Sequence, residues 1–352
     1  MKEKGLLTLL GSICMVFVLV ATLFMAAHAQ PASKQAPIEL KFAHYSPPGH
    51  PMIEGIAAPW SKMVEEKTKG KLKVTIYPAE TLCKMVDTYD AVVSGIADIG
   101  YGLTQITPGR FPLSMVMTIP FSPWTSSSAL ASQVAQKLYV EGKIAKEWSD
   151  VKLLFIYTTP PSTIFLTKPI RTLKDAKGTK IVMYAHTAEG EGLEAIGFTP
   201  VSLPTTEVYL GLQRGIVEGT TLTWESCAGR KIYEIAKYAL DLKMSTVPFY
   251  YVMNLKKWNS LPPDVKEVLN NLSGMWGSKF AGEAVDGYNQ RAKTNVVMPA
   301  LKEVIVLSPD ELERWHKTAG VGKDWWIAGV EKKGLPGKEI YDATVRITKE
   351  IR

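Results

Sequence analysis

The chain has 352 residues, of which 46% are hydrophobic and 21% are charged, and its formal net charge is +7. This is the composition of an ordinary globular protein, which excludes disorder, collagen and coiled coils, and the length is typical of about two domains. The positive charge is mild and scattered, without a basic stripe or an arginine-rich arm. It therefore argues against nucleic acid as a partner and is compatible with anionic ligands and acidic partner surfaces.

The N-terminal residues form a segment of their own. Two lysines are followed by an apolar run from Gly5 to Ala27, which ends in the small-x-small pattern Ala27-His28-Ala29. A basic start, an apolar middle and such an ending predict a secretory signal peptide, residues 1–29, with cleavage after Ala29. An uncleaved anchor is the alternative, because the run is long enough to span a bilayer. We expect an exported, periplasmic protein.

Two cysteines, Cys83 and Cys227, lie beyond this segment. An oxidising compartment permits a disulfide, but two cysteines are no disulfide framework. We expect two small, partly buried thiols, and a Cys83–Cys227 disulfide is the alternative.

Strands and helices alternate along the rest of the chain. Alternating or short apolar runs predict strands, and apolar residues three and four apart predict helices. The predicted strands cover residues 38–43, 71–77, 97–101, 151–158, 164–166 and 180–184. The predicted helices cover residues 53–67, about 83–93, 188–196, 205–212, about 262–303 and 309–330. Pro59 should bend the first helix or mark an irregular start. The order of these elements is typical of a parallel, doubly wound sheet followed by a second α/β layer, so the predicted fold class is α/β.

The motifs of familiar enzyme classes are absent from the sequence. It has no phosphate-binding loop and no nucleophile elbow, and the glycines of residues 190–197 have the wrong spacing for a dinucleotide fingerprint. No two histidines lie at i, i+4 as in zinc hydrolases. A hydrolytic triad of a serine with His44, His50 or His186 stays open, although no motif points to it. We expect a binding protein with no catalytic residues, no cofactor and no bound metal.

A series of short motifs runs from residue 42 to residue 238. The most specific are Gly-Phe-Thr-Pro-Val at 197–201, Glu-Val-Tyr at 207–209, Leu-Gln-Arg-Gly-Ile-Val-Glu-Gly at 212–219 and Tyr-Glu-Ile-Ala-Lys-Tyr at 233–238. Weaker ones lie at 42–44, 50–51, 71–78, 93–99 and 173–181. In this order and spacing the series resembles the solute receptors of TRAP (tripartite ATP-independent periplasmic) transporters, in the dicarboxylate-receptor (DctP-like) class.

The resemblance implies a periplasmic binding protein fold with two α/β lobes, parallel or mixed sheets flanked by helices, and a ligand cleft between the lobes. Lobe 1 would take residues 38–157 plus about 252–285, and lobe 2 would take 158–251 plus about 286–352, with the C-terminal helices wrapping both. It also implies a monomer that captures an organic acid by lobe closure and docks on one small and one large membrane subunit. A receptor that feeds a signalling protein, and a periplasmic enzyme, are the alternatives.

The sequence departs from the family pattern where the solute carboxylate is usually bound. The family has an arginine directly after a Lys-Ile pair, and here Val182 takes that place. A second basic position falls near Ser162, which is also neutral, and a polar pair falls on Thr220 and Thr221. Since Thr221 cannot supply a carboxylate and Glu225 lies at a different offset, the carboxylate that holds a cation in some relatives has no counterpart.

The predicted site is therefore more apolar and aromatic than the family pattern, which suits an aromatic or amphipathic acid better than a short dicarboxylate. Arg110 is the leading candidate to pair with the solute carboxylate, with a surface arginine as the alternative reading. His50 and backbone N–H groups at a helix start are other options, and a neutral solute stays open. For each aromatic candidate, a place in the hydrophobic core is the alternative to a place in the site. The candidate ligand-binding residues are Tyr45, His50, Tyr101, Arg110, Ser162, Val182, Tyr184, Thr221, Trp224, Glu225 and Tyr250.

Overall fold

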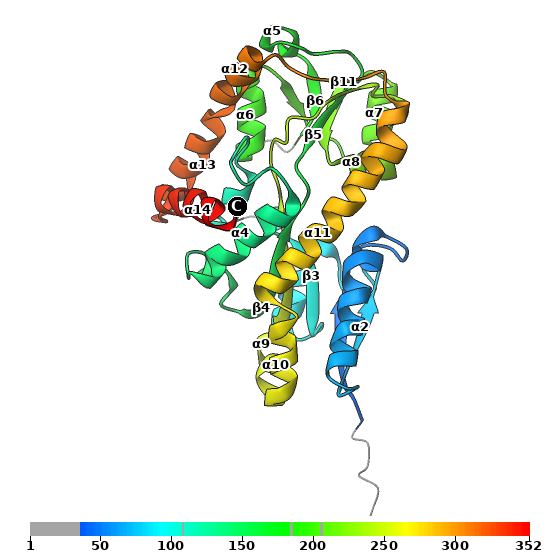
Figure 1. Cartoon of the computed structure of the whole chain (residues 1–352), viewed down its shortest axis with the longest axis vertical. Coiled ribbons are helices and arrows are strands. Elements are labelled where there is room, and N and C mark those ends of the chain that lie inside the picture. Colours follow the sequence, from blue (N-terminus) through cyan, green and yellow to red (C-terminus); the bar gives the residue numbers. More distant parts are fainter. Residues whose placement is uncertain (1–35, 108, 184–185, 205–206) are drawn as a thin grey trace, which may run out of the picture. The chain divides into compact units, whose positions relative to one another are not determined.

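The computed structural model describes residues 36–107, 109–183, 186–204 and 207–352. The predicted signal peptide and the candidate residue Tyr184 lie outside these ranges. Within residues 39–352 the chain builds two β-sheets with helices packed around them (Figure 1). Among the described residues, no helix combines the length and the apolar character that crossing a membrane requires.

The first sheet has five strands in the order β2-β1-β3-β10-β4. Its strands are β1 (Ile38–Ala43), β2 (Leu72–Tyr77), β3 (Ile99–Leu103), β4 (Val151–Thr158) and β10 (Pro248–Asn254). β1 pairs with β3 in parallel, whereas β10 is antiparallel to both β3 and β4. The sheet is therefore mixed, because a strand from late in the chain is inserted between β3 and β4.

The second sheet has six strands in the order β11-β9-β5-β8-β6-β7. Its strands are β5 (Thr163–Leu166), β6 (Lys180–Val182), β7 (Thr199–Val201), β8 (Gly219–Leu222), β9 (Tyr238–Leu240) and β11 (Glu303–Ile305). β6 lies parallel to β7 and β8, and β5 is antiparallel to β8 and β9.

The chain crosses from the first sheet to the second between β4 and β5, and returns between β9 and β10. The two crossing segments pair with each other: Thr159 N donates to Val247 O and Ser162 N donates to Ser245 O, both at 2.9 Å. The return occurs before Pro248, earlier than the boundary near residue 251 that the sequence predicted, since Pro248 to Tyr251 already pair with β4.

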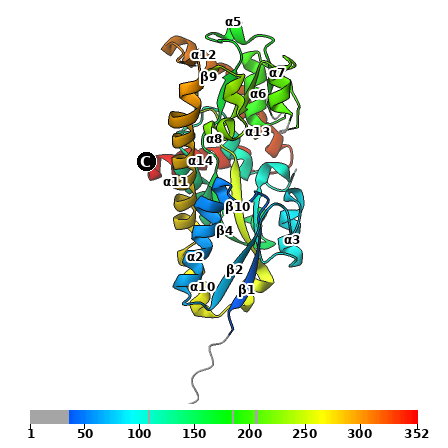
Figure 2. The same cartoon turned by 90° about the vertical axis from the view of Figure 1, so that its right-hand side faces the viewer.

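Helices cover both sheets. They are α2 (Ala58–Lys67), α3 (Thr88–Ser94), α4 (Ser128–Val140), α5 (Leu173–Ala176), α6 (Ala188–Ile196), α7 (Val208–Gln213), α8 (Trp224–Gly229), α9 (Leu255–Ser260), α10 (Pro263–Asn271), α11 (Gly274–Ala292), α12 (Pro309–Ala319), α13 (Val321–Glu331) and α14 (Gly337–Ile351). The long helix α11 packs on α4 and β4 near the first sheet and on α8 near the second (Figure 2). α12 and α13 pack on α6, while α14 packs on α4.

Several helix boundaries differ from the predicted ones. The helix expected from residue 53 starts with a π-helical turn, Ile53–Ala57, and Pro59 lies in the first turn of the α-helix that follows, which is the irregular start that this proline indicated. The segment predicted as one helix at 262–303 is broken into α10, α11 and shorter turns, partly because Gly274 takes a φ of +57°. α4 and α14 were not predicted.

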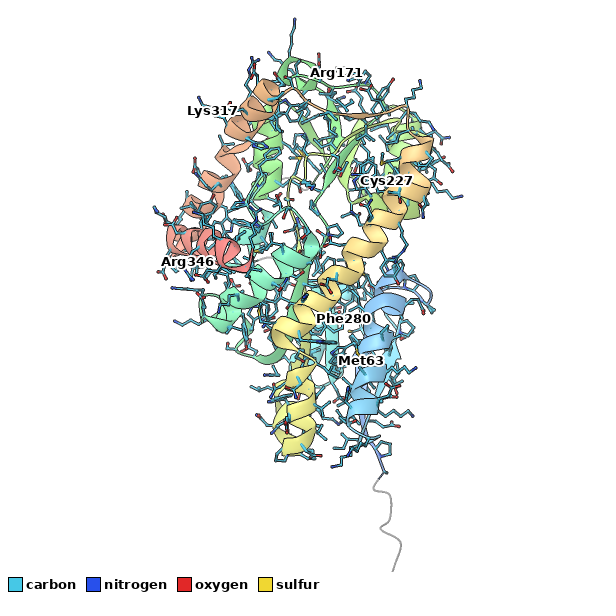
Figure 3. The ribbon with its side chains drawn as sticks, viewed as in Figure 1. Met63, Arg171, Cys227, Phe280, Lys317 and Arg346 are labelled. Atoms are coloured by element: carbon cyan, nitrogen blue, oxygen red, sulfur yellow. The ribbon has the colours of Figure 1, made fainter. Side chains whose placement is uncertain are left out.

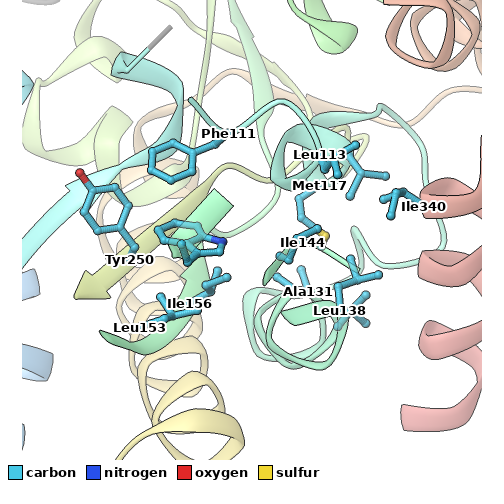
Figure 4. Packing of buried hydrophobic residues seen from close by; sticks show 14 of the residues in the cluster. Phe111, Leu113, Met117, Ala131, Leu138, Ile144, Leu153, Ile156, Tyr250 and Ile340 are labelled. Atoms are coloured by element: carbon cyan, nitrogen blue, oxygen red, sulfur yellow. The ribbon is translucent and has the colours of Figure 1, made fainter. Parts of the chain in front are cut away.

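Two candidate aromatic residues belong to the hydrophobic core. Tyr250 and Phe111 lie side by side in the hydrophobic core of the first sheet (Figure 4). Trp148 packs against both rings, and it stacks on Phe111 at 4.4 Å. Trp224 packs edge-on against Phe165, with 5.1 Å between the ring centroids. Both belong to a hydrophobic cluster of the second sheet that also contains Cys227, which is labelled in Figure 3. The thiols of Cys83 and Cys227 are both free.

Candidate functional site

A cavity of about 800 Å³ is lined by residues of the first sheet, the second sheet and the two crossing segments. It lies where β3 and β4 end on one side and where β6 and β8 end on the other, so loops and strand ends contribute most of its wall. Such clefts at strand ends are where α/β proteins hold small ligands.

The first sheet contributes an aromatic wall, formed by Tyr45, Tyr101, Tyr157 and Phe249. The ring planes of Tyr45, Tyr157 and Phe249 are within 15° of the plane of Tyr101, at centroid distances of 5.0 to 6.2 Å. Tyr45 and Phe249 are half-buried and present ring surface to the cavity, while Tyr101 and Tyr157 are buried. β3 and β4 flank β10, so cross-strand neighbours bring the rings together.

The phenol groups of this wall are linked by hydrogen bonds. Tyr157 Oη donates to Tyr101 Oη at 2.8 Å, and Tyr101 Oη lies 3.3 Å from Tyr45 Oη. Burial raises the pKa of Tyr101 and of Tyr157 well above the usual value, so both hydroxyls stay neutral. The imidazole of His44 also stacks on the ring of Tyr101, at a centroid distance of 4.2 Å. The wall is therefore uncharged and rigid.

The second sheet contributes a smaller, mostly neutral wall. Val182 and Met183 come from the end of β6, and the run from Thr220 to Thr223 comes from the end of β8. Leu203 and Val208 add apolar surface. These side chains offer hydroxyl groups and methyl groups to a ligand, and no permanent charge.

Charged groups lie at three places in the cavity, which are Glu80, the neighbouring Glu225 and Arg230, and Glu189. Arg230, directly after α8, is exposed, and Glu225 is partly buried. Both also line a second cavity of about 600 Å³, together with His50 and Ser226. Burial lowers the pKa of His50, although the nearby Glu225 opposes this effect, so the imidazole is neutral at pH 7.

Glu189 lies in the first turn of α6 and lines the cavity away from Arg230. Its Oε1 accepts a hydrogen bond from the Ser162 hydroxyl, and the Ser245 side chain is a second hydrogen-bonding partner. Burial raises the pKa of Glu189, and the hydrogen bonds from the two serines lower it. Through these hydrogen bonds, Glu189 connects α6 to both crossing segments.

The structure brings seven of the eleven candidate residues to the wall of this cavity: Tyr45, His50, Tyr101, Ser162, Val182, Thr221 and Glu225. Tyr184 lies outside the described residues. Arg110, Trp224 and Tyr250 do not line the cavity.

Arg110 is held away from the cavity by carboxylates of the protein itself. Its guanidinium lies 3.1 Å from Asp90 and 3.3 Å from Asp150, and it covers the ring of Tyr89 at 4.3 Å. Because its guanidinium already pairs with two carboxylates, Arg110 has no free pair of parallel N–H donors for a solute carboxylate. The alternative reading of Arg110, a surface arginine that closes a loop, is the one that fits this geometry.

The lining residues that the sequence analysis did not propose include Tyr157, Phe249, Glu189 and Arg230. Tyr157 lay near the end of a predicted strand, just before the break at Pro160. Because ligands bind at strand ends, this position could have identified it as a candidate. Glu189 was at the start of a predicted helix. Phe249 and Arg230 had no local signal, because β10 and the end of α8 acquire their place only through pairing with distant segments.

Among the described residues, no group of three or more histidine, cysteine, aspartate or glutamate side chains is arranged to hold a metal ion. The polar side-chain groups of the cavity are hydroxyls, carboxyls, the carboxamide of Gln105, one guanidinium and one neutral imidazole. This set suits hydrogen bonding and one ion pair with a small organic molecule.

Comparison with known proteins identifies the family. The model of the bacterial extracellular solute-binding protein family 7, DctP, matches residues 42–321. The chain belongs to this family. A relative in the family, the C4-dicarboxylate-binding periplasmic protein DctP of Vibrio cholerae, is 25% identical over 288 residues, which are 79% of this chain and 83% of that protein.

Solved structures of TRAP solute-binding proteins agree with this assignment. A TRAP periplasmic solute-binding protein from Desulfovibrio salexigens matches with a TM-score of 0.80 and 30% identity, over 90% of this chain and 97% of that one. A TRAP solute-binding protein from a marine metagenome, specific for aromatic acid ligands and solved with 3-hydroxybenzoate, matches with a TM-score of 0.81 and 28% identity, over 90% and 99%. The two-lobe α/β fold and the assignment as a TRAP solute receptor rather than an enzyme are confirmed.

Proposed function

We propose that this receptor captures an aromatic or amphipathic monocarboxylate in the 800 Å³ cavity and delivers it to the small and large membrane subunits of a TRAP transporter. The observation that carries the proposal is the wall of four nearly parallel rings in a cavity whose lining includes one arginine and no lysine.

The ring wall favours a flat, apolar body in the solute. Tyr45 and Phe249 present ring surface, and offset or edge-on packing of an aromatic solute against such rings contributes about 0.5–1.5 kcal/mol beyond the burial of apolar area. The buried pair Tyr101 and Tyr157 keeps the wall in place, so little ordering is needed when the solute binds.

Arg230 is the proposed partner of the solute carboxylate. Among the described residues, no carboxylate forms an ion pair with its guanidinium, which donates a 3.4 Å hydrogen bond to the carbonyl oxygen of Ser226. A free guanidinium can donate two parallel hydrogen bonds to a carboxylate and keeps its charge at every physiological pH. Arg230 thus takes the role that the sequence assigned to Arg110.

A single cation also favours one carboxylate over two. A C4-dicarboxylate bound here would bury its second carboxylate without a permanent counter-ion, and an unpaired buried charge is costly. The metagenome relative that is specific for aromatic acids supports the same solute class, whereas the name of the Vibrio cholerae relative indicates C4-dicarboxylates. We favour the aromatic class because of the charge and ring content of this cavity.

Capture would occur by closure of the two lobes about the paired crossing segments. The solute contacts Tyr45 and Phe249 on one wall and Arg230 on the other, so it stabilises the closed form by its differential affinity for that form. The protein would be exported by residues 1–29, cleaved after Ala29, and act in the periplasm as a monomer. An ion gradient in the membrane subunits would drive transport.

Calorimetric titration of the exported, purified protein tests this function. Benzoate, phenylacetate and their substituted forms are compared with succinate, malate and neutral aromatic amides. We expect binding of aromatic monocarboxylates, a loss of tenfold or more in Arg230→Gln, and affinity within twofold of the wild type in the matched control Arg110→Gln. Binding of succinate and malate alone would overturn the proposed solute class and leave the receptor assignment in place.

A further inference from the structure

The carboxyl group of Glu189 lies in the wall of the solute cavity and is held in one orientation. Ser162 donates to its Oε1, Ser245 bonds to it as well, and the backbone of Ser162 pairs with that of Ser245 at 2.9 Å. A carboxylate has about four acceptor positions, so two serines leave acceptor capacity on the cavity side. Glu189 is therefore a fixed acceptor that faces the solute.

No cation of the protein neutralises this carboxyl group. Among the described residues, no lysine, arginine or histidine forms an ion pair with Glu189. A solute carboxylate next to Glu189 would meet an acceptor of like charge, which is unfavourable in a poorly solvated cavity. The carboxylate end of the solute must therefore lie elsewhere.

The cation of the cavity lies at a different end. Arg230 shares the second cavity with His50, Glu225 and Ser226, whereas neither Glu189 nor its serine partners line that second cavity. Arg230 is thus on the side where the two cavities adjoin, and Glu189 is next to the crossing segments. The site has two poles, one that attracts a carboxylate and one that accepts a hydrogen bond.

We propose that Glu189 is a specificity-determining residue that accepts a hydrogen bond from an O–H or N–H group at the end of the solute opposite its carboxylate. The receptor then selects hydroxy- or amino-substituted aromatic monocarboxylates over the unsubstituted acids. This inference rests on the proposed function. When an unsubstituted acid binds in the closed site, the Glu189 carboxylate loses water and gains no hydrogen-bond donor. This desolvation cost weakens binding of the unsubstituted acid strongly relative to the substituted one.

The titration of Glu189 is compatible with this role. Burial raises its pKa, and a donor from the solute would favour the charged form and lower the pKa again. The exclusion of the solute carboxylate from this end requires the ionised form of Glu189, which the hydrogen bonds from Ser162 and Ser245 favour.

Calorimetric titration with matched pairs of acids tests the inference on the exported protein. The pairs are phenylacetate with 3- and 4-hydroxyphenylacetate, and benzoate with 3-hydroxy- and 3-aminobenzoate. The variants are Glu189→Ala and Glu189→Gln, and the matched control is Glu191→Ala, which changes a carboxylate of the same helix that does not line the cavity. Thermal unfolding of each variant checks that it is folded.

We expect at least one substituted acid to bind the wild type and Glu191→Ala tenfold or more tightly than its unsubstituted partner. In Glu189→Ala this ratio should fall to within threefold, with affinity for the unsubstituted acid unchanged or higher, and Glu189→Gln should give a ratio between the two. Equal binding of substituted and unsubstituted acids by the wild type would overturn the role of Glu189 while leaving the proposed function standing. If no aromatic acid binds at all, the proposed function fails, and this inference fails with it.

Discussion

Tyr157 donates a hydrogen bond to Tyr101 across strand β10, with 2.8 Å between the two hydroxyl oxygens. The ring of Phe249, on β10 itself, lies 5.4 Å from each of these two rings. The three strands are thus joined at the cavity wall by one hydrogen bond and three nearly parallel rings. This arrangement fixes the surface on which we propose that the solute packs.

Tyr157→Phe removes the donor of this bond and leaves the ring in place. We expect the free energy of unfolding to fall by about 0.5–1.5 kcal/mol, the usual contribution of one buried hydrogen bond. Urea denaturation of wild type and variant measures the difference. A variant as stable as the wild type would show that the Tyr101 hydroxyl finds sufficient partners elsewhere.

Arg110→Gln should affect stability slightly. The guanidinium is 31% exposed and pairs with Asp90 and Asp150, whose side chains are 73% and 56% exposed, so solvent screens both ion pairs. We expect a loss of about 1 kcal/mol at most in the free energy of unfolding, measured by urea denaturation. Asp150→Asn, which removes one of the two pairs, should lose less. A loss of several kcal/mol in Arg110→Gln would mean that its packing on Tyr89 dominates.

Tyr250→Phe should leave the protein as stable as the wild type or more stable, by up to about 1 kcal/mol, because deleting an unpaired buried polar group removes its desolvation cost. The Tyr250 hydroxyl is buried and has no hydrogen-bond partner among the described residues. It fills the space beside Gly102, where a Cβ would lie 2.1 Å from Oη. Thermal unfolding checks this prediction, and a clear destabilisation would reveal a hydrogen bond to bound water. Gly102→Ala should be strongly destabilising in the same assay.

His44 should make stability depend on pH in the acid range. Burial, with a smaller contribution from His50, lowers the pKa of His44 from 6.5 to about 3. Between these values the unfolded chain binds a proton that the folded protein does not. The contribution of this group is therefore fully present above pH 6.5 and is lost as the pH falls toward 3.

His44→Asn removes this titration and keeps an acceptor for the backbone N–H of Ser46, which lies 3.2 Å from Nδ1 of His44. The variant should be less stable at pH 7, because it loses the stacking on Tyr101. Its free energy of unfolding should then decline less steeply below pH 6.5, by about 1.4 kcal/mol for each pH unit at most. Urea denaturation between pH 4 and pH 7 measures both slopes, and parallel slopes would rule out His44 as the cause.

Local pattern was sufficient for much of the fold. The strands at 38–43 and 151–158 and the helix at 188–196 were predicted with the observed bounds, because their alternation, periodicity and end signals act within a few residues. The insertion of β10 between β3 and β4 could not be predicted from local sequence pattern. It depends on pairing between residues about 150 and 95 positions apart, for which no local pattern exists.

The family, and with it the role of a solute receptor, was likewise readable from the order and spacing of short motifs. The site was readable only in part: residues beside strand ends, such as Tyr45, Val182 and Thr221, do line the cavity. Which arginine is free was decided by tertiary structure alone, because Asp90 and Asp150 come close to Arg110 only in the folded chain, whereas Arg230 meets no carboxylate among the described residues. The sequence determines that a side chain carries a charge. Whether that charge can pair with a solute depends on which protein side chains lie beside it in the folded structure.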